Sequence, residues 1–520
     1  MASHALLVGA GIALSRLSGL VRERVFAHYF GNSDAGDAFK AALKIPNVLQ
    51  NLFGEGVLSA SFIPVYAKKL ADGNEAEATK LAGVLGTLLF LLMALLASLG
   101  VWATPYLIDL IAPGFTGAKR LLTIDIVRIL FPGTALLVMS AWCLGILNSH
   151  RKFFLSYAAP VMWNFAIIAA MLYFGGKTDL SSLARYTAWG LVLGSLSQLL
   201  VQLPSALRLT KRLRPSLNVR TDGSPTVLKN FVPVLFSRGV VQISAYIDNV
   251  IASLLPTGAV SSLAYAQTIY LLPVSLFGMS VSASELPILS QATGSESERN
   301  TFLITRINRG LERVAYYVIP SAAAFIILGN YVVGALFQTG NFGVSDTHAV
   351  WFVLIGASIG LLASTQSRLY SSAFYSLKDT RTPLRFAIVR VVLGIAVGLT
   401  LALKVPEWLG INPMWGTAGL TLAASIASWI EFTLLRRAFN HRVGLTGMHR
   451  AFQLRVWLCA IAACSVAAGV TYFVPTSVHI IARALLAAGI MGVLYLALTL
   501  AFQLEPAREL YGKIRRRIGQ

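Results

Sequence analysis

The stretch SASFIP at residues 59–64 recurs as SASELP at residues 282–287, and each copy is preceded by a Leu-Phe-Gly run. Two further pairs repeat at nearly the same distance, residues 110–115 with 336–342 and residues 148–152 with 376–381. One such pair could arise by chance, but three pairs in the same order indicate two homologous halves. Many transporters place a binding site near the membrane midplane between halves of this kind.

The composition around these repeats is that of an integral membrane protein. Hydrophobic residues make up 56% of the chain, charged residues only 12%, and the mean hydropathy is +0.68. Soluble domains contain about 25% charged residues. Runs such as 81–108 and 484–502 approach or exceed the ~20 apolar residues that a helix needs to cross a bilayer. The apolar segments lack period-two alternation, so we expect helices and not a barrel.

Hydropathy predicts an all-α polytopic membrane protein with about fourteen transmembrane helices. The repeat groups them into two six-helix lobes in a pseudo-twofold arrangement, followed by two extra C-terminal helices. The predicted domains are an N-terminal lobe (1–212), a cytoplasmic linker (213–229), a C-terminal lobe (230–441), and a helix pair with a basic tail (442–520).

The formal net charge of +21 is distributed according to the predicted topology. Most of the 43 lysines and arginines lie in alternate connections, whereas the remaining connections carry only Lys119, Arg120, Lys177, Arg185 and Lys404. Retention of basic residues in the cytoplasm explains this bias and predicts that both termini are cytoplasmic. Because the basic residues are interleaved with apolar spans, a nucleic-acid-binding domain is excluded.

Motifs for catalysis or cofactor binding are absent from the sequence. There is no GxxxxGK[ST] nucleotide-binding run, and His, Cys and carboxylate residues do not cluster as a metal or nucleophile site requires. Cys143, Cys459 and Cys464 lie inside apolar segments and read as small buried hydrophobes. We therefore expect no cofactor, no metal and no enzyme, and transport is the class of function that remains.

Charged residues at membrane depth concentrate in the first two predicted segments. The first carries Arg16, Arg22 and Glu23. The second carries a stripe at helical spacing, formed by Asp37, Lys40, Lys44, Asn47, Asn51 and Glu55. Such charges cost ~2.5–3.5 kcal/mol at a helix centre and normally face a cavity or a partner. The stripe predicts an aqueous cavity, and the alternative is that Asp37, Lys40 and Lys44 pair among themselves.

Further polar residues are scattered through later segments, and each could serve structure or ligand contact. They are Asp125, Arg128, Asn164, Arg238, Asp248, Glu285, Arg368, Arg390 and Glu431. The excess of arginine favours an anionic substrate, because a guanidinium group binds phosphate in a bidentate manner and stays charged when dehydrated.

Several motifs match one family in order along the chain. They are SR at 15–16, GLVRE at 19–23, DAF at 37–39, KIPN at 44–47, GEG at 54–56, FIP at 62–64, APGF at 112–115, LFQTG at 336–340 and DTRTP at 379–383. With these residues the sequence resembles the MurJ (MviN) family of lipid II flippases, in the multidrug/oligosaccharidyl-lipid/polysaccharide exporter superfamily.

The resemblance implies two lobes around a central cationic cavity that opens alternately to each side of the cytoplasmic (inner) membrane. It implies transport of undecaprenyl-pyrophosphate disaccharide pentapeptide, or lipid II, to the outer leaflet, with the two extra helices forming a groove for the lipid tail. Membrane lipids and cell-wall synthesis enzymes are the other expected partners.

The resemblance also assigns roles to individual residues of this sequence. Arg16 and Arg22 would meet the pyrophosphate, Asp37 and Glu55 would support the cavity or its gate, and Asn164 would contact sugar. Lys44 joins this cavity set as part of the polar stripe.

Two positions depart from the family pattern. Gln50 stands where the family usually has an arginine in the second segment, and Thr268 stands where it usually has one in the eighth. Arg238 or Arg368 could supply the missing charge. Asp248 matches a sodium-site carboxylate of some family members, but its usual amide or carboxylate partners are replaced by Arg390 and glycines, so we predict no sodium site. Our hypothesis is an internal ion pair between Asp248 and Arg390.

Flipping of lipid II is the leading functional prediction. The alternatives are export of another polyprenyl-pyrophosphate-linked glycan or amphiphile, which the two missing arginines favour, and a non-transporting membrane scaffold for cell-wall synthesis. A membrane enzyme is the least favoured, because no acidic metal motif faces a large soluble loop.

Overall fold

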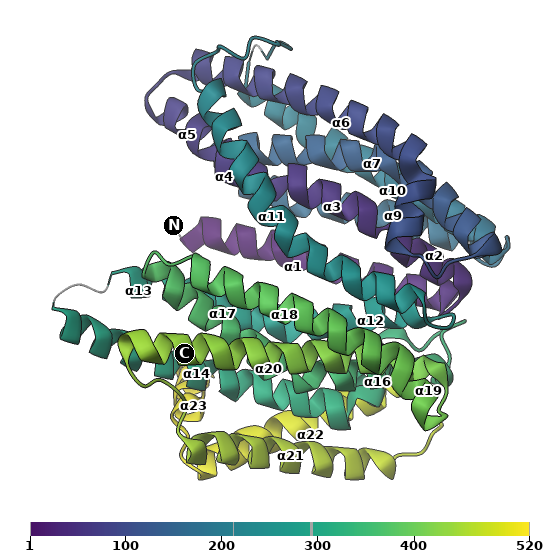
Figure 1. Ribbon diagram of the computed structural model, residues 1–520, viewed down its shortest axis with the longest axis vertical. Coiled ribbons are helices and arrows are strands. Elements are labelled where there is room, and N and C mark those ends of the chain that lie inside the picture. The colour runs from purple at the N-terminus through teal and green to yellow at the C-terminus, as the bar shows by residue number, and fades with distance from the viewer. Residues whose placement is uncertain (1, 212, 292–294, 519–520) are drawn as a thin grey trace. The chain divides into compact units, whose positions relative to one another are not determined.

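The computed structural model describes residues 2–211, 213–291 and 295–518, and it is built of helices (Figure 1). The predicted all-α fold is therefore confirmed. The chain forms two compact units. The first unit comprises Met1–Ser261 and Thr339–Phe342, and the second comprises Ser262–Gln338 and Gly343–Gln520. Helix α11, which the repeat assigned to the C-terminal lobe, packs in the first unit, against α3, α4 and α6. The domain boundaries predicted from the repeat remain a prediction.

In the described part of the chain, the first unit contains eleven helices and the first turn of a twelfth. They are α1 (Ala2–Phe30), α2 (Asp34–Ala42), α3 (Lys44–Phe53), α4 (Glu55–Ser61), α5 (Ile63–Ala71), α6 (Glu75–Ile111), α7 (Gly117–Ser149), α8 (Phe153–Ala158), α9 (Pro160–Phe174), α10 (Leu180–Leu209), α11 (Ser224–Ser253) and the first turn of α12 (Ala259–Pro273). Helix α10 packs on α7 and α9, and α1 packs on α8 and α9.

The polar second segment is broken into the four short helices α2 to α5. Breaks fall at Leu43, Gly54 and Phe62, and Pro64 occupies the first turn of α5, where its missing N–H costs nothing. Pro46 and Pro64 follow two of these breaks within three residues, whereas the break at Gly54 has no proline beside it. Backbone hydrogen bonds bridge each break, from Asn47 N to the Leu43 oxygen, from Leu58 N to the Gly54 oxygen and from Tyr66 N to the Phe62 oxygen (3.0–3.1 Å).

The core of the first unit is formed by aromatic and branched side chains of α4 to α7, including Phe62, Tyr66 and Trp142. Gly86 allows close packing against Trp142, because a Cβ there would lie 2.9 Å from the indole. The indole nitrogen donates to the backbone oxygen of Ala82 (3.2 Å). Close approach at small residues is the main way in which helices associate in lipid.

The second unit holds the rest of α12 and the remaining helices. They are η1 (Val274–Met279), α13 (Ser280–Ser290), α14 (Glu296–Ile327), α15 (Gly329–Phe337), α16 (Val344–Ile359), α17 (Leu361–Ser376), α18 (Arg381–Leu399), η2 (Thr400–Lys404), α19 (Val405–Leu409), η3 (Pro413–Trp415), α20 (Gly416–Val443), α21 (Arg450–Tyr472), α22 (Ile480–Ala501) and α23 (Glu505–Ile518). Helix α20 packs on α16, α17 and α18, and the paired helices α21 and α22 pack on α14 and α15 respectively (Figure 1).

Ten helices of the described residues are long and apolar enough to cross a membrane, or eleven if the bent pair α16 and α17 forms one span. Helix α6 carries exposed apolar side chains such as Leu95 and Trp102, as expected for a helix that faces lipid. The protein is thus a multi-pass membrane protein. The predicted count of about fourteen spans remains a prediction, and the polar segments α1, α2 to α5 and α11 are not among the ten.

Candidate anion-binding site

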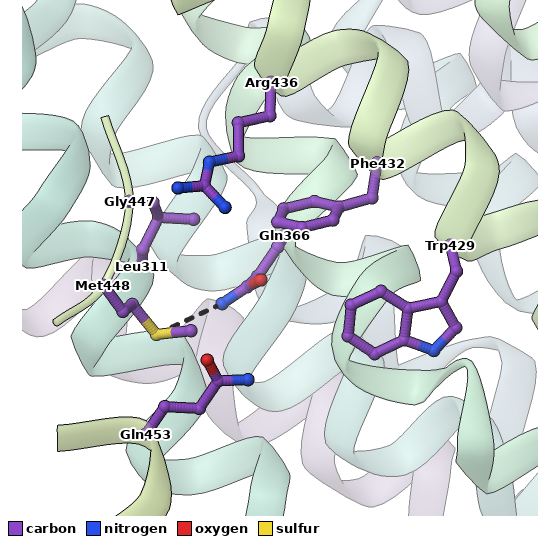
Figure 2. Close-up of a pocket in the computed structure, with 8 residues that line it drawn as sticks. All are labelled: Leu311, Gln366, Trp429, Phe432, Arg436, Gly447, Met448 and Gln453. Carbon is purple, nitrogen blue, oxygen red and sulfur yellow. Dashed lines mark hydrogen bonds between the residues drawn. The ribbon is translucent and has the colours of Figure 1, made fainter. Parts of the chain in front are cut away.

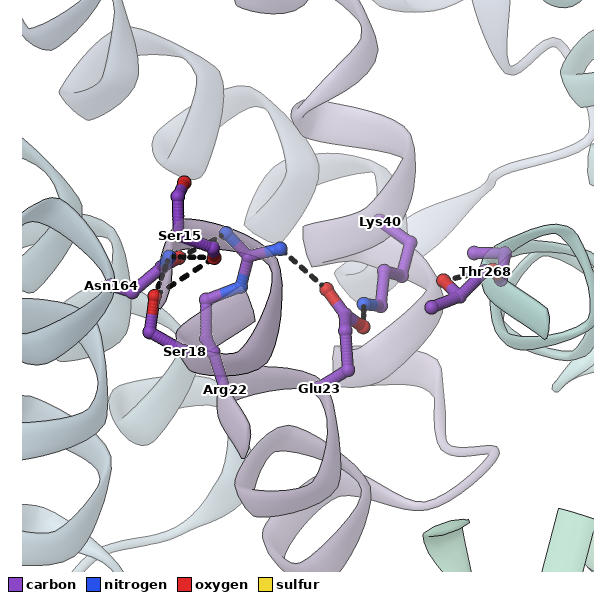
Figure 3. Close-up of polar contacts among 8 residues, drawn as sticks. Ser15, Ser18, Arg22, Glu23, Lys40, Asn164 and Thr268 are labelled. Carbon is purple, nitrogen blue, oxygen red and sulfur yellow. Dashed lines mark hydrogen bonds and ion pairs between the residues drawn. The ribbon is translucent and has the colours of Figure 1, made fainter. Parts of the chain in front are cut away.

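Helix α1 places its two candidate arginines in different environments. Arg16 is exposed and makes no hydrogen bond or ion pair with another described residue. Arg22 is half-buried, with a side chain 20% exposed. One of its terminal nitrogens donates to Asn164 Oδ1 (2.9 Å), and the other pairs with Glu23 Oε1 (2.7 Å). The Trp163 ring lies 4.7 Å from the guanidinium carbon. Arg22 is therefore held in one position (Figure 3).

Asn164 is the centre of this arrangement. It lies on α9 and is buried, and both the oxygen and the nitrogen of its carboxamide form hydrogen bonds. While its oxygen accepts from Arg22, its nitrogen donates to Ser18 Oγ (2.8 Å) and to the backbone oxygen of Ser15 (3.4 Å). Since the amide cannot rotate without losing these bonds, Asn164 fixes the orientation of Arg22 relative to α9.

Glu23 joins α1 to α2 through Lys40. Both side chains are buried, and the Lys40 ammonium group donates to the carboxylate oxygen that Arg22 does not use. Lys40 also lies over the Phe26 ring, 4.2 Å from its centroid. One carboxylate thus faces two cations, so the cluster keeps a net positive charge.

Asp37 occupies a separate, fully satisfied position. It is 1% exposed and accepts hydrogen bonds from the backbone nitrogens of Gly258 and Ser261, both at 2.8 Å. Its carboxylate also pairs with Lys119 (2.8 Å), which contacts Asp34 at 2.9 Å. The two backbone donors belong to the first turn of α12, where helix N–H groups lack partners and attract negative charge. Asp37 therefore anchors this turn.

Of the remaining first-unit candidates, the structure describes the side chain of Lys44 but not those of Glu55 and Arg238. Lys44 is half-buried at the start of α3, its backbone oxygen accepts from Tyr246 (2.5 Å), and it interacts electrostatically with half-buried Asp248. Glu55 begins α4 and Arg238 lies within α11, but their side chains are outside the described residues.

Candidates of the second unit gather around Glu431 on α20. Arg390 on α18 pairs with Glu431 at 3.5 Å, and exposed Arg368 on α17 also acts on this carboxylate electrostatically. Thr268, at the departure from the family pattern, donates to the Ala264 oxygen of its own helix (3.0 Å) (Figure 3). Asp248 and Arg390 belong to different units, so their predicted ion pair remains a prediction.

Two contacts of the candidate residues were missed by sequence reasoning. Trp163 covers Arg22, and Lys119 pairs with Asp37. A tryptophan in an apolar helix and a lysine in a short connection carry no signal of these roles, because both contacts depend on helices that are distant in sequence. In the part of the chain that the structure describes, no group of three His, Cys, Asp or Glu residues could hold a metal.

The helical fold and its polar first segments together define a polytopic membrane transporter. The fold is similar to that of a solved lipid II flippase MurJ in an inward closed conformation, with a TM-score of 0.76 and 23% identity over 96% of this chain and 100% of that chain. It is also similar to an inward-facing multidrug resistance MATE family transporter of the MOP superfamily. There the TM-score is 0.64 and the identity 16%, over 82% of this chain and 95% of that chain.

The chain belongs to the lipid II flippase MurJ family, whose sequence pattern matches residues 26–491. It is 31% identical to a probable lipid II flippase MurJ of Rhizobium meliloti over 82% of this chain and 78% of that protein. It is also 31% identical to a lipid II flippase MurJ of Burkholderia cenocepacia, over 83% of this chain and 82% of that protein. The family predicted from the motifs is confirmed.

Proposed function

We propose that this protein moves lipid II from the inner to the outer leaflet of the cytoplasmic membrane by alternating access. Its relatives are named lipid II flippases, and the similarity covers most of their length. The observation that carries the proposal is the Arg22 cluster, in which a guanidinium group is held in place by Asn164, Glu23 and Trp163. A preorganised cation binds a diphosphate with little loss of side-chain entropy.

Arg22 has donors left for a ligand. Of five guanidinium N–H groups, one donates to Asn164 and one to Glu23, so three remain. Arg16, which is exposed six residues earlier on α1, is free to make a second contact. We assign the pyrophosphate to these two arginines. Lys44, Glu55, Arg238 and Arg368 remain candidates for the rest of the cavity.

Asn164 acts in this proposal on Arg22 and not on the sugar. Its oxygen and nitrogen are already bonded to protein groups, and the side chain is buried. Asp37 likewise supports the site at the start of α12, where its carboxylate has three partners within 3 Å: the backbone nitrogens of Gly258 and Ser261, and Lys119.

The test is complementation of a bacterial strain depleted of its own lipid II flippase. We expect the wild-type chain to restore growth and Arg22→Ala to fail, because loss of a charge-assisted contact costs about 1.5–3 kcal/mol of binding. Arg128→Ala is the matched control, since exposed Arg128 contacts only the Val101 backbone oxygen among described residues (3.4 Å).

Two outcomes would contradict the proposal. Failure of a well-expressed wild-type chain would favour export of another polyprenyl-pyrophosphate-linked glycan, in keeping with Gln50 and Thr268 at the two positions where the family usually has arginine. Full growth with both Arg16→Ala and Arg22→Ala would favour a scaffold for cell-wall enzymes.

A further inference from the structure

A small pocket in the second unit lies outside the cluster described above. Its volume is about 120 Å³, and it opens between α14, α17, α20, α21 and the connection 444–449 (Figure 2). Its lining residues are Leu311, Gln366, Trp429, Phe432, Arg436, Gly447, Met448 and Gln453. One cation, two amides and two aromatic rings therefore line one pocket, in which Arg436 is exposed.

Arg436 supplies the positive charge. Its Nε donates to the Thr446 backbone oxygen (3.0 Å), whereas its outer nitrogens make no hydrogen bond or ion pair with any residue that the structure describes. Gly447 makes room for the guanidinium group, because a Cβ there would lie 2.3 Å from Arg436 Nη2. The neighbouring backbone is anchored, since the Gly447 nitrogen donates to Asn308 Oδ1 (2.8 Å). The cation is thus held in position with two donor groups unused.

Gln366 supplies a buried acceptor. It is 1% exposed, and its amide nitrogen contacts only the Met448 sulfur (3.5 Å), which is a weak acceptor. Its Oε1 accepts no hydrogen bond from another residue in the described part of the chain, and it lines the pocket. Figure 2 shows Gln366 directed into the pocket below Arg436. This oxygen calls for a donor from a ligand or from water.

The aromatic wall completes the chemistry. Trp429 and Phe432 pack edge to face with ring centroids 5.7 Å apart, and the Trp429 indole nitrogen is fixed to the Ile359 oxygen (2.9 Å). An apolar surface beside a cation and a hydrogen-bond acceptor fits an amphiphile better than a free inorganic ion.

We propose that this pocket binds the headgroup of an anionic glycerophospholipid. The phosphate contacts the outer nitrogens of Arg436, a headgroup hydroxyl donates to Gln366 Oε1, and the glycerol and first methylenes lie against Trp429 and Phe432. This site is separate from the Arg22 cluster and does not depend on the proposed transport function.

The position of the pocket supports a lipid as the source of the phosphate. Arg436 lies seven residues before α20 ends at Val443, or about 10 Å along the axis, so its long side chain reaches the interfacial layer. The charge bias predicts that this end faces the cytoplasm. Arg437, Arg442, Arg450 and Arg455 follow nearby in sequence. Basic pockets between helices on that side attract anionic headgroups.

The experiment uses the full chain in nanodiscs of phosphatidylcholine, with or without phosphatidylglycerol, and measures the thermal unfolding midpoint and the lipid retained in native mass spectra. We expect phosphatidylglycerol to raise the midpoint of the wild type, because a ligand of the folded state stabilises it. Arg436→Ala should weaken retention about tenfold and abolish the rise. Arg437→Ala, an exposed neighbour, should keep both.

Two glycine variants test the geometry of the pocket. Gly447→Ala would displace the Arg436 guanidinium and should abolish the phosphatidylglycerol effect. Gly444→Ala has a comparable backbone penalty, since φ is +127° there and +151° at Gly447, but its Cβ would meet Ile304 instead. It should retain the effect, even if the baseline midpoint falls.

Three results would overturn the proposal. Equal losses in Arg436→Ala and Arg437→Ala would mean general attraction to a charged surface. The same rise with inorganic phosphate in phosphatidylcholine nanodiscs would mean a soluble phosphate site. No lipid-dependent rise in the wild type would mean that water alone fills the pocket.

Discussion

Arg22 differs from Arg16 in how its surroundings restrict it. Asn164 contacts Arg22 across 142 positions of sequence, and Trp163 from the same helix covers the guanidinium face. Arg16 has no such partner among the described residues. Under the proposed function, a restrained arginine and an exposed arginine on one helix would suit a ligand that must be bound and then released.

Asn164 should therefore contribute to transport only through Arg22. We expect Asn164→Ala to lower lipid II transport in reconstituted vesicles about tenfold in the wild type, and to change nothing further in an Arg22→Ala background. A double-mutant cycle of these rates measures the coupling. Asn164→Gln has the same amide and should recover part of the loss. Independent, additive losses would show that Asn164 contacts the substrate itself.

Asp37 should be important for stability. Asp37→Asn would leave partly buried Lys119 without its nearest counter-charge and weaken the first turn of α12, so we expect a loss of about 3 kcal/mol. Asp34→Asn is the matched control, because Asp34 contacts the same lysine but its side chain is 61% exposed, and its pair contributes at most about 1 kcal/mol. Unfolding in detergent by denaturant would measure both, and equal losses would refute this role of Asp37.

The polar residues of the site could be recognised in the sequence, but their partners could not. Polar residues in apolar segments stand out by composition, so Arg22, Asp37 and Asn164 were identified as candidates. Lys40 illustrates what remained open, because helical spacing placed it beside Asp37 and Lys44, whereas it pairs with Glu23 of the preceding helix. Spacing describes neighbours on one helix and carries no information about the helix opposite.

At the scale of elements, the most irregular part of the first unit is the second predicted segment. The second predicted segment has become α2 to α5, and three of its four helices start without a side-chain cap. Proline removes a backbone donor, and Pro46 and Pro64 each follow one of these breaks within three residues. The chain breaks at Leu43, Gly54 and Phe62, and the resulting helices all pack against α7, while α3 and α4 also pack against α11.

Asp379 lies just before α18, and its contacts there make the stability of the folded state depend on pH. The backbone nitrogen of Thr382 donates to its carboxylate (3.0 Å) at the start of α18, and Arg442 pairs with it at 3.0 Å. These contacts hold the pKa of Asp379 below its ordinary value, and the Thr382 hydrogen bond is the larger cause. Because the pKa is lower in the folded state, the stabilisation is present above the unfolded pKa near 4 and is lost as pH falls through the folded pKa.

Asp379→Asn should therefore destabilise the folded state by about 1 kcal/mol at pH 7 and lower the thermal unfolding midpoint accordingly. The difference in midpoint between wild type and variant should shrink as the pH falls below about 4. Asp179→Asn is the comparison, since Asp179 caps α10 through Ser182 without a basic partner among the described residues. A difference between wild type and Asp379→Asn that did not change with pH would contradict this account.

At the scale of the whole molecule, charge bias determines orientation. Basic residues in alternate connections predict that both termini are cytoplasmic. Alkaline phosphatase fused after Gln520 should be inactive, and a fluorescent protein at the same point should fluoresce. Phosphatase inserted after Lys177, in a connection predicted to be outside, should be active. An active C-terminal phosphatase would show that the orientation is inverted.

The sequence by itself determined membrane insertion, the helical class and the family. These properties follow from apolar content and local motifs, which each segment carries independently of the others. Tertiary structure alone decided that Asn164 fixes Arg22, that Asp37 holds the first turn of α12, and that Arg436 and Gln366 share a pocket. Each of these contacts joins groups from distant segments, and its energy depends on distances of about 3 Å that hydropathy and helical spacing do not specify.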